Sequence, residues 1–265
     1  MELSPRTLPL RLPSTAREGA QLRVRQARTQ ADLRAALRLR GRMFRNAAPG
    51  RPGSGGDDRD SFDSRSLHLL VEETVSGRLL GCCRLLLHSC GREILGGYAA
   101  RHYGLARLAR HPGPMAELGR LCIDPAGPGP EVARLIVGAV AGIVLRHHIG
   151  WLFGCSSLPG VEPGRWHDTL ALLASRHGPP ARWRPEPVAA QALPLPPPEG
   201  ADLRAGLRAM PAPLRSYLAL GAWVSDHAVV DRDLGTLHLF TALEISAVAP
   251  RRAAFLSRSP EAPPA

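Results

Sequence analysis

Six charged residues stand inside or beside apolar segments of this chain, where an ionised side chain is costly unless it is paired or contacts a ligand. The charges of both signs are interspersed, and two phenylalanines accompany them. The series is Arg40, Phe44, Asp60, Phe62, Asp63, Arg84, Glu117 and Arg120. It has the chemistry to hold a small zwitterion, with carboxylates for an ammonium group and a guanidinium fork for a carboxylate. It could equally form only internal salt bridges, and both readings are open at this point.

Two spacings within the series are informative. Segment 60–63 (DSFD) places two carboxylates three residues apart around an apolar side chain, a compact negative site for an ammonium group or an arginine. Glu117 and Arg120 straddle Gly119 in a predicted strand. An odd spacing sends their side chains to opposite faces unless a bulge intervenes, and a glycine favours a bulge. For each residue alone, a salt-bridge role is the more common one.

Hydrophobic periodicity and turn residues indicate the elements that must position these side chains. Thr29 can cap a helix that carries Arg40 and Phe44 one turn apart. A loop rich in Gly, Pro and Asp, 46–58, follows this helix. The predicted strands are 21–27, 67–72, 79–87, 115–123, 151–155 and 237–243, the predicted helices are 30–45, 98–110, 131–147, 162–177 and 213–220, and an apolar turn is predicted at 222–224. This order predicts an α/β fold, with a mixed central sheet and helices on both faces.

Composition narrows the class of partner. The net charge of +11 and the pI near 10.9 favour an anionic partner, and every basic residue is arginine, in keeping with a compositional bias of the genome. Aromatic residues make up only 5% of the chain and do not interleave with basic ones, which argues against nucleic acid. An acidic protein and an anionic membrane surface remain as candidates.

The spacing of cysteines, histidines and apolar residues tests for disulfides, a metal site and a membrane-spanning helix. The five cysteines lack CxxC spacing, and their odd number without a signal peptide indicates reduced thiols in the cytosol. The histidines show no ligand spacing, so no metal site is predicted. The longest apolar run, 135–145, is shorter than the ~20 residues that a bilayer requires and indicates a buried helix.

The order of the motifs resembles a known family. RxxxF in the first helix, DxFD after a loop, an arginine in GCCRLL and ExxR before an apolar strand resemble the acyl-homoserine-lactone autoinducer synthases. The similarity is greater to the ornithine lipid acyltransferases. Segments similar to that family are 118–123 (LGRLCI), 152–160 (LFGCSSLPG), 217–222 (YLALGA) and 231–236 (DRDLGT). The resemblance runs from about residue 22 to residue 256, and Leu234 and His238 depart from the family pattern.

This resemblance implies a GNAT-like (acyl-CoA N-acyltransferase-like) fold with a C-terminal extension. It also implies transfer of a 3-hydroxyacyl chain from acyl carrier protein to the α-amine of L-ornithine, giving lyso-ornithine lipid in the first step of ornithine lipid synthesis. No bound cofactor is expected. Loop 125–130 only loosely resembles the pyrophosphate loop of coenzyme A acetyltransferases, and its prolines lack N–H donors, which favours a carrier-protein donor over coenzyme A.

Two alternatives stand beside this function. One is N-acylation of another amino acid or of an autoinducer-type amine, and segment 217–236 argues against autoinducer synthesis. The other is a non-catalytic, haemolysin-like protein that binds lipid or membrane. The presence of the whole charged series favours catalysis over that alternative.

The mechanism that the resemblance implies assigns roles to the series. Glu117 is the candidate general base, although it could instead pair with Arg84 or Arg120. Either Arg120 or Arg40 would bind the amino-acid carboxylate, and the two aspartates of segment 60–63 would hold the δ-ammonium or brace an arginine. Glu117 and Arg120 are therefore the predicted catalytic residues, and the predicted substrate-binding residues are Arg40, Phe44, Asp60, Phe62, Asp63 and Arg84.

Two further expectations concern the reacting centre. Backbone N–H groups at a bulge in 121–123 would stabilise the oxyanion, as acetyltransferase-like folds imply. Cys155 lies in an apolar strand without an evident histidine partner, so it is interpreted as a structural thiol and not as a nucleophile.

The predicted organisation is a disordered, arginine-rich tail (1–20), a GNAT-like core (21–184), a Pro-rich linker (185–200), a C-terminal part that completes the fold (201–256) and a disordered tail (257–265). Acyl carrier proteins are acidic in the families resembled, so an arginine-rich surface would steer one to the enzyme. The amphiphilic product and the positive charge predict a cytoplasmic enzyme, peripheral on the cytoplasmic face of the inner membrane.

Overall fold

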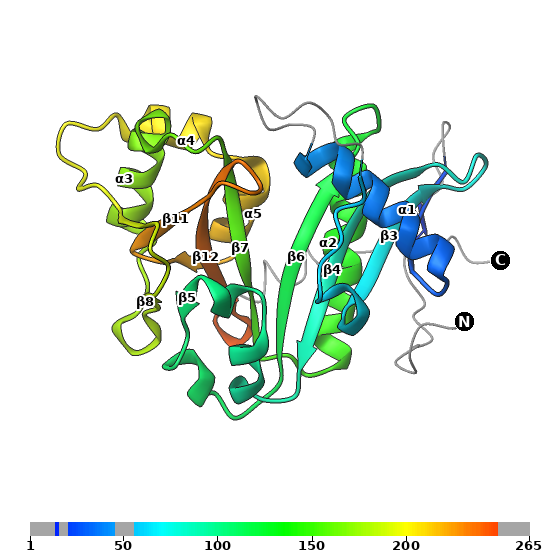
Figure 1. Cartoon of the computed structure of the whole chain (residues 1–265), viewed down its shortest axis with the longest axis horizontal. Helices are drawn as coiled ribbons and strands as arrows, with labels where there is room; N and C mark the ends of the chain where they lie inside the picture. The colour runs from blue at the N-terminus through cyan, green and yellow to red at the C-terminus, as the bar shows by residue number, and fades with distance from the viewer. Residues whose placement is uncertain (1–13, 16–20, 46–55, 249–265) are drawn as a thin grey trace. The chain divides into compact units, whose positions relative to one another are not determined.

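A computed structural model describes residues 14–15, 21–45 and 56–248, which divide into two compact units (Figure 1). The first unit contains the described residues up to Leu87 together with Leu118–His148, and the second contains His88–Glu117 and 149–248. Strand β6 (Met115–Ile123) contributes residues to both. The domain boundaries predicted from the sequence stay predictions, and the predicted tails, except for residues 14–15, lie outside the described residues.

The first unit is built on a sheet with the strand order β1-β2-β3-β4-β6. Adjacent strands from β1 to β4 are antiparallel, and the register pairs His68 with Arg84 and Leu70 with Cys82. Its further elements are β1 (Ser14–Thr15), β2 (Leu22–Gln26), β3 (Leu67–Glu73), β4 (Leu79–His88), α1 (Gln30–Arg40), η1 (Gly41–Arg45), η2 (Asp63–Arg65) and α2 (Gly129–Arg146). The predicted strands are confirmed here to within one or two residues, and β1 adds a short strand inside the stretch predicted as a tail.

Helices α1 and α2 cover opposite faces of this sheet (Figure 1). A Cβ on Gly81 would meet Val132 of α2, whereas its neighbour Cys82 packs in the same apolar cluster as Ala36 and Leu39 of α1. Successive residues of a strand point to opposite faces, so the two helices lie on the two sides. The predicted arrangement of helices on both faces is confirmed for this unit.

Helix α1 begins as predicted and ends earlier. The Thr29 side chain accepts a hydrogen bond from the Asp32 N–H, forming a capping box. After Arg40 the chain continues as the π-helical turn η1, and a Cβ on Gly41 would lie 2.3 Å from the carbonyl oxygen of Gly56. Glycine at position 41 therefore lets the segment that begins at residue 56 pass close to the end of the helix.

The second unit contains another sheet region, in the order β7-β12-β11-β9, with β10 also paired to β12. All of these pairs are antiparallel, and β7 and β12 pair along nine residues. The strands are β5 (Tyr103–Gly104), β7 (Trp151–Pro159), β8 (Glu186–Pro187), β9 (Ala192–Pro194), β10 (Trp223–Val224), β11 (His227–Asp231) and β12 (Thr236–Glu244), the α-helices are α3 (His167–Arg176), α4 (Leu203–Ala209) and α5 (Ala212–Ala219), and the 3-10 turns are η3 (Gly91–Gly96), η4 (Ala99–Arg101), η5 (Leu108–Arg110), η6 (Pro163–Trp166), η7 (Ala181–Trp183) and η8 (Ile245–Ala247).

Several local predictions for this unit need correction. The helix predicted over 98–110 is wrong, because the segment forms the short turns η4 and η5 around strand β5. Gly104 in β5 pairs with Glu186 of β8, and a Cβ on Gly104 would lie 2.9 Å from the Glu186 Cβ. Residues 223–224 form strand β10 within the predicted turn, and β11 was not predicted. Among the described residues, no helix is long and apolar enough to cross a membrane.

Candidate active site

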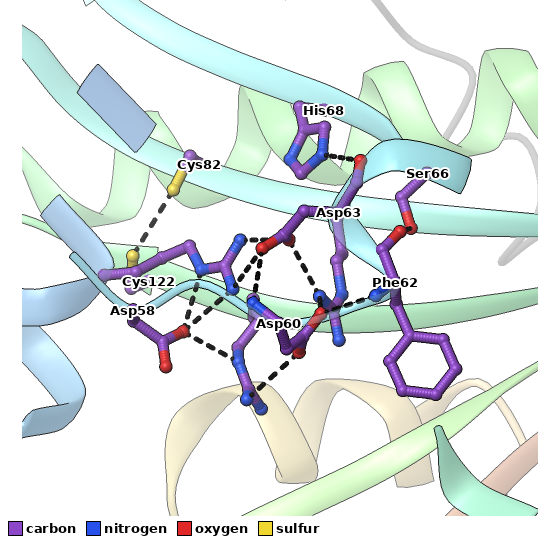
Figure 2. Close-up of polar contacts among 11 residues, drawn as sticks. Asp58, Asp60, Phe62, Asp63, Ser66, His68, Cys82 and Cys122 are labelled. Carbon is purple, nitrogen blue, oxygen red and sulfur yellow. Dashed lines mark hydrogen bonds and ion pairs between the residues drawn. The ribbon is translucent and has the colours of Figure 1, made fainter. Parts of the chain in front are cut away.

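The first unit brings together every predicted site residue except Glu117. Three arginines and three aspartates form one continuous set of ion pairs between α1, segment 56–65, β4 and β6, which we call the Arg–Asp network (Figure 2). Its members are Arg40, Arg84, Arg120, Asp58, Asp60 and Asp63. Figure 2 shows the three aspartates close together, with dashed lines marking their hydrogen bonds and ion pairs, and His68 bonded to Asp63.

Arg40 is the centre of the network and is almost completely buried, with 1% of its side chain exposed. Its Nε donates to Asp58 Oδ2 at 2.9 Å, its Nη2 lies 2.8 Å from the same oxygen, and its Nη1 donates to Asp63 Oδ1 at 2.6 Å. These contacts engage Arg40 with two carboxylates inside the protein. The structure therefore favours a bracing role for Arg40 over the predicted role of binding a substrate carboxylate.

Arg84 and Arg120 complete the network. Arg84 Nη1 donates to Asp60 Oδ1 at 2.5 Å and to Asp63 Oδ1 at 2.8 Å. Arg120 Nε donates to Asp58 Oδ2 at 2.9 Å, and its Nη2 donates to Asp60 Oδ2 at 3.4 Å. The side chains of Arg120 and Asp60 are 11% and 17% exposed, more than any other member. They form the outer end of the network.

Charge balance explains how this set can be buried. Three guanidinium groups face three carboxylates, so the network is neutral as a whole, and removing one partner would leave a buried charge uncompensated. Burial raises the pKa of Asp60, but the hydrogen bond from Arg84 and the charges of Arg84 and Arg120 outweigh it, leaving that pKa below its usual range. Asp60 is thus held ionised.

A local irregularity in β6 sets the direction of Arg120. Its backbone has φ of 52°, in the left-handed region that few residues other than glycine occupy. A Cβ on Gly119 would point toward Arg84, 3.6 Å from its Nε, and the next residue, Arg120, also reaches this network. Two successive residues therefore face the same side, as at a bulge. The sequence located the irregularity correctly, but Arg120 and not Gly119 adopts the unusual conformation.

Two members of this region were missed by sequence reasoning. Asp58 is fully buried and bridges Arg40 and Arg120, yet it lay in the segment interpreted only as a loop. His68 of β3 is also buried, and its Nε2 lies 2.9 Å from the carbonyl oxygen of Asp63, so it is the donor in that hydrogen bond. Burial lowers the pKa of His68 despite this hydrogen bond. A count of charges would not have indicated Asp58, because the predicted series already balanced its three arginines with Asp60, Asp63 and Glu117.

The two predicted phenylalanines contact the arginines of the network. The guanidinium carbon of Arg84 lies 5.6 Å from the centre of the Phe62 ring, and that of Arg120 lies 5.9 Å from the centre of the Phe44 ring. These are cation–π distances. Phe62 is buried and Phe44 is partly exposed, so the aromatic faces limit the positions that Arg84 and Arg120 can adopt.

Glu117 belongs to the second unit, where its carboxylate binds backbone groups. Oε2 accepts a hydrogen bond from the Tyr98 N–H at 3.0 Å, and Oε1 accepts one from the Ala99 N–H at 2.6 Å. His88 Nε2 lies 3.9 Å from Oε2. A Cβ on Gly97 would lie 2.4 Å from Oε2, so the chain turns closely around this carboxylate. Glu117 fixes the start of η4, and a carboxylate with about four lone-pair sites can still accept a proton while doing so.

His238 and Cys155 lie elsewhere in the second unit. The Tyr103 hydroxyl donates to the carbonyl oxygen of His238 at 2.8 Å and lies 3.0 Å from its Nδ1. His238, which departs from the family pattern, is thus part of a buried polar contact, and burial raises the pKa of the Tyr103 hydroxyl. Cys155 is a partly exposed thiol on β7 and forms no disulfide.

The loop between β6 and α2 has its N–H groups committed within the protein. Positions 125, 128 and 130 are proline and carry no N–H. The Ala126 N–H donates to the Asp124 side chain, the Gly127 N–H to the Asp124 carbonyl, the Gly129 N–H to the Gly127 carbonyl and the Glu131 N–H to the Pro128 carbonyl. An anion at this loop would have to displace one of these bonds to obtain an N–H donor.

Comparison with known proteins agrees with this architecture. Residues 39–137 match the family model described as "Acetyltransferase (GNAT) domain", which confirms the predicted fold class. This range contains Arg40, Asp60, Arg84 and Arg120. A curated acyl-homoserine-lactone synthase of Agrobacterium fabrum is 38% identical over 69 residues, covering 26% of this chain and 32% of that protein.

The similarity to another group extends over most of the chain. An L-ornithine N(alpha)-acyltransferase of Rhizobium meliloti is 33% identical over 250 residues, covering 88% of this chain and 83% of that protein. One of Rhodobacter capsulatus is 30% identical over 247 residues, covering 90% of this chain and 95% of that protein. The chain therefore belongs to the L-ornithine N(alpha)-acyltransferase family.

Proposed function

We propose that the protein transfers a 3-hydroxyacyl chain from acyl carrier protein to the α-amine of L-ornithine, giving lyso-ornithine lipid. Family membership over most of the chain supports acyl transfer, and the names of the relatives support ornithine as the acceptor. This reaction would be the first step of ornithine lipid synthesis.

The loop between β6 and α2 is the observation that supports acyl carrier protein, and not coenzyme A, as the acyl donor. In residues 124–131 each backbone nitrogen is either a proline nitrogen or the donor of a hydrogen bond within the protein. Coenzyme A presents a pyrophosphate, which such loops bind through backbone N–H groups at a helix N-terminus. A carrier protein presents a single phosphodiester and a protein surface, so it depends less on such donors. This observation favours the carrier-protein thioester.

The Arg–Asp network is the proposed acceptor site. Arg120 is assigned to the amino-acid carboxylate because its side chain lies at the outer end of the network and has the planar fork suited to a carboxylate. Asp60, also at the outer end, is assigned to the δ-ammonium. Arg40 and Asp63 are buried inside the network and hold these two residues in position. Arg84 contacts both Asp60 and Asp63, and so links the outer end of the network to its buried part.

The chemical step is direct attack of a neutral amine on the thioester carbonyl. The N–C bond forms, the C–S bond breaks, and the thiol leaves with a proton. Ornithine's α-amine is mostly protonated near neutral pH, so a base speeds the step, and Glu117 is assigned this role directly or through water. Backbone N–H groups of residues 121–123 in β6 are assigned to the developing oxyanion.

The test is direct turnover with purified components. The full chain is incubated with 3-hydroxyacyl carrier protein and a panel of amino acids, and free thiol and acylated product are both measured. We expect thiol release that depends on ornithine and far less turnover with the coenzyme A thioester. Ornithine-independent turnover would contradict the acceptor assignment. Binding of acyl lipid without turnover of any amine would favour the non-catalytic alternative.

We also propose peripheral association with an anionic membrane. The net charge of +11 and the amphiphilic product support this location. Co-sedimentation with vesicles containing anionic lipid, and release by salt, are the expected results. Equal recovery in the supernatant with neutral and anionic vesicles would argue against it.

A further inference from the structure

Helix α1 presents a stripe of arginines on its outward face. Arg34, Arg38 and Arg42 follow one another at intervals of four residues, running from α1 into η1, and all three are exposed. The opposite face, with Leu33 and Leu37, is buried. Residues four apart lie one above the other on a helix, so the three guanidinium groups form one line, which we call the α1 arginine stripe.

The stripe has a local energetic cost. Like charges at intervals of four residues repel one another and destabilise a helix. The acidic residue of α1, Asp32, is engaged by Arg25 at 2.7 Å and by the capping box. Within α1, all of whose residues are described, the outward face carries no carboxylate to balance Arg34 and Arg38. An external anionic partner would supply that balance.

The stripe leads to the loop that precedes α2. Arg42 Nη2 lies 3.8 Å from Asp124 Oδ2, and its side chain is 56% exposed. Arg78, exposed in the hairpin between β3 and β4, donates through Nη2 to the Ala126 carbonyl at 3.3 Å. Two exposed guanidinium groups, those of Arg42 and Arg78, therefore contact the loop between β6 and α2.

We propose that the α1 arginine stripe and Arg78 form the docking surface for the acidic acyl carrier protein. The proposal rests on the carrier-protein donor of the proposed function. The acidic surface of the carrier protein would lie along Arg34 and Arg38. The single phosphodiester of its prosthetic arm would be met by Arg42 and Arg78, because the N–H groups of the loop are already bonded.

Charge and exposure favour an acidic protein over a membrane at this face. A helix that lies on a bilayer combines basic residues with large apolar residues that insert between the lipids. None of the exposed large apolar residues of the described chain lies on α1, and the hairpin that carries Arg78 has one, Val75. The stripe is therefore suited to steering a folded acidic partner, which raises the association rate.

Charge reversal on the stripe tests the proposal. The main variant is Arg38→Glu, which places a negative charge four residues from Arg34 and from Arg42 and so replaces two like-charge pairs by opposite-charge pairs. Arg34→Glu/Arg38→Glu gives a larger charge change. The matched control is Arg204→Glu/Arg208→Glu, which reverses two exposed arginines with the same spacing on α4.

The measured quantities are kcat and KM for each substrate at low and moderate salt. For both stripe variants we expect KM for the carrier-protein donor to rise about tenfold or more, with a weaker salt dependence. We expect kcat, KM for ornithine, and turnover of a short acyl-pantetheine donor to stay within about twofold of wild type, since the stripe acts on encounter and not on chemistry. The α4 control should match wild type throughout.

The contrary outcomes are distinct. If the stripe variants keep the wild-type KM for the carrier protein, or if the α4 control shows the same rise, the docking assignment is wrong. Loss of binding to anionic vesicles with an unchanged KM would assign the stripe to a membrane instead. If the wild-type enzyme uses only the coenzyme A thioester, the proposed acyl donor is wrong. This result is obtained with the wild-type protein alone, so it is distinguished from a failure of the docking proposal.

Discussion

Arg120 Nε donates a hydrogen bond to Asp58 Oδ2 at 2.9 Å, joining a left-handed residue of β6 to the segment that passes the end of α1. The same oxygen of Asp58 lies 2.8 Å from Arg40 Nη2. A left-handed conformation in a residue with a side chain costs about 1–3 kcal/mol and persists only where its surroundings enforce it. The buried carboxylate of Asp58 is positioned to do so, because it anchors the guanidinium group that the kink directs inward.

Replacement of this carboxylate should destabilise the fold. Asp58→Asn leaves Arg40 with a neutral partner in a fully buried position, and breaking a buried ion pair from one side costs about 3–5 kcal/mol. Urea denaturation measures the free energy of unfolding. The neighbouring Asp57→Asn removes an exposed carboxylate and should change it by less than about 0.5 kcal/mol. Equal stability of the two variants would show that Asp58 does not anchor the network.

Two variants at position 120 distinguish the role of the Arg120 side chain from that of the left-handed backbone. Glycine adopts the left-handed region without strain, so Arg120→Gly allows the same backbone conformation in β6 while removing the guanidinium group. Arg120→Lys keeps the charge but loses the planar fork. We expect both variants to raise KM for ornithine about tenfold or more, with the glycine variant the more severe, and to leave KM for the acyl donor nearly unchanged. A wild-type KM for ornithine in Arg120→Gly would remove Arg120 from the acceptor site.

The sequence was sufficient for the parts of the fold that periodicity determines. Alternating apolar residues in β3 and β4, and the capped amphipathic pattern of α1, allowed those elements to be placed to within a few residues. The helix predicted over 98–110 failed for a tertiary reason. The N–H groups of Tyr98 and Ala99 bind the distant carboxylate of Glu117. Gly104 lies against Glu186 in a strand pair, so local propensity was overridden.

The sequence predicted most of the residues that form the site, but not which of them pair with one another. The arginines and aspartates were recognised as a set, but their pairing depends on how α1, β4 and β6 are brought together by the chain. Asp58 shows the limit most clearly. Its burial follows from the close passage of residue 56 against Gly41, a contact between residues distant in sequence that no local pattern encodes.

His68 predicts a specific dependence of stability on pH. Burial lowers its pKa in the folded protein below the ordinary value of 6.5, opposed by the hydrogen bond to the Asp63 carbonyl, and the charges of Arg40 and Arg84 act in the same direction as burial. Below pH 6.5 the unfolded chain binds a proton that the folded protein does not, so the free energy of unfolding falls as the pH falls from 6.5 to the folded pKa. Asp60 has a lowered pKa, so its contribution is lost only below pH 3.8.

The variant His68→Gln isolates this contribution, since glutamine can still donate to the Asp63 carbonyl but does not titrate. Denaturation curves are measured at several values between about pH 7.5 and pH 5. The wild-type free energy of unfolding should decline more steeply than that of the variant. Parallel curves for the two proteins would mean that His68 is not held neutral by its surroundings.

Glu117→Gln tests whether the carboxylate that binds Tyr98 and Ala99 also acts as a base. The variant replaces one acceptor oxygen by an NH₂ group facing a backbone N–H, so a loss of stability of about 1–3 kcal/mol is expected. If Glu117 removes the amine proton, kcat should fall about 100-fold or more at neutral pH and recover partly at alkaline pH, where the amine loses its proton unaided. The control is Glu93→Gln, an exposed carboxylate that accepts the Ser89 N–H at 2.7 Å and should leave kcat unchanged. A Glu117→Gln protein that remains folded and keeps wild-type activity at every pH would restrict Glu117 to its structural role, and the base would have to be sought elsewhere.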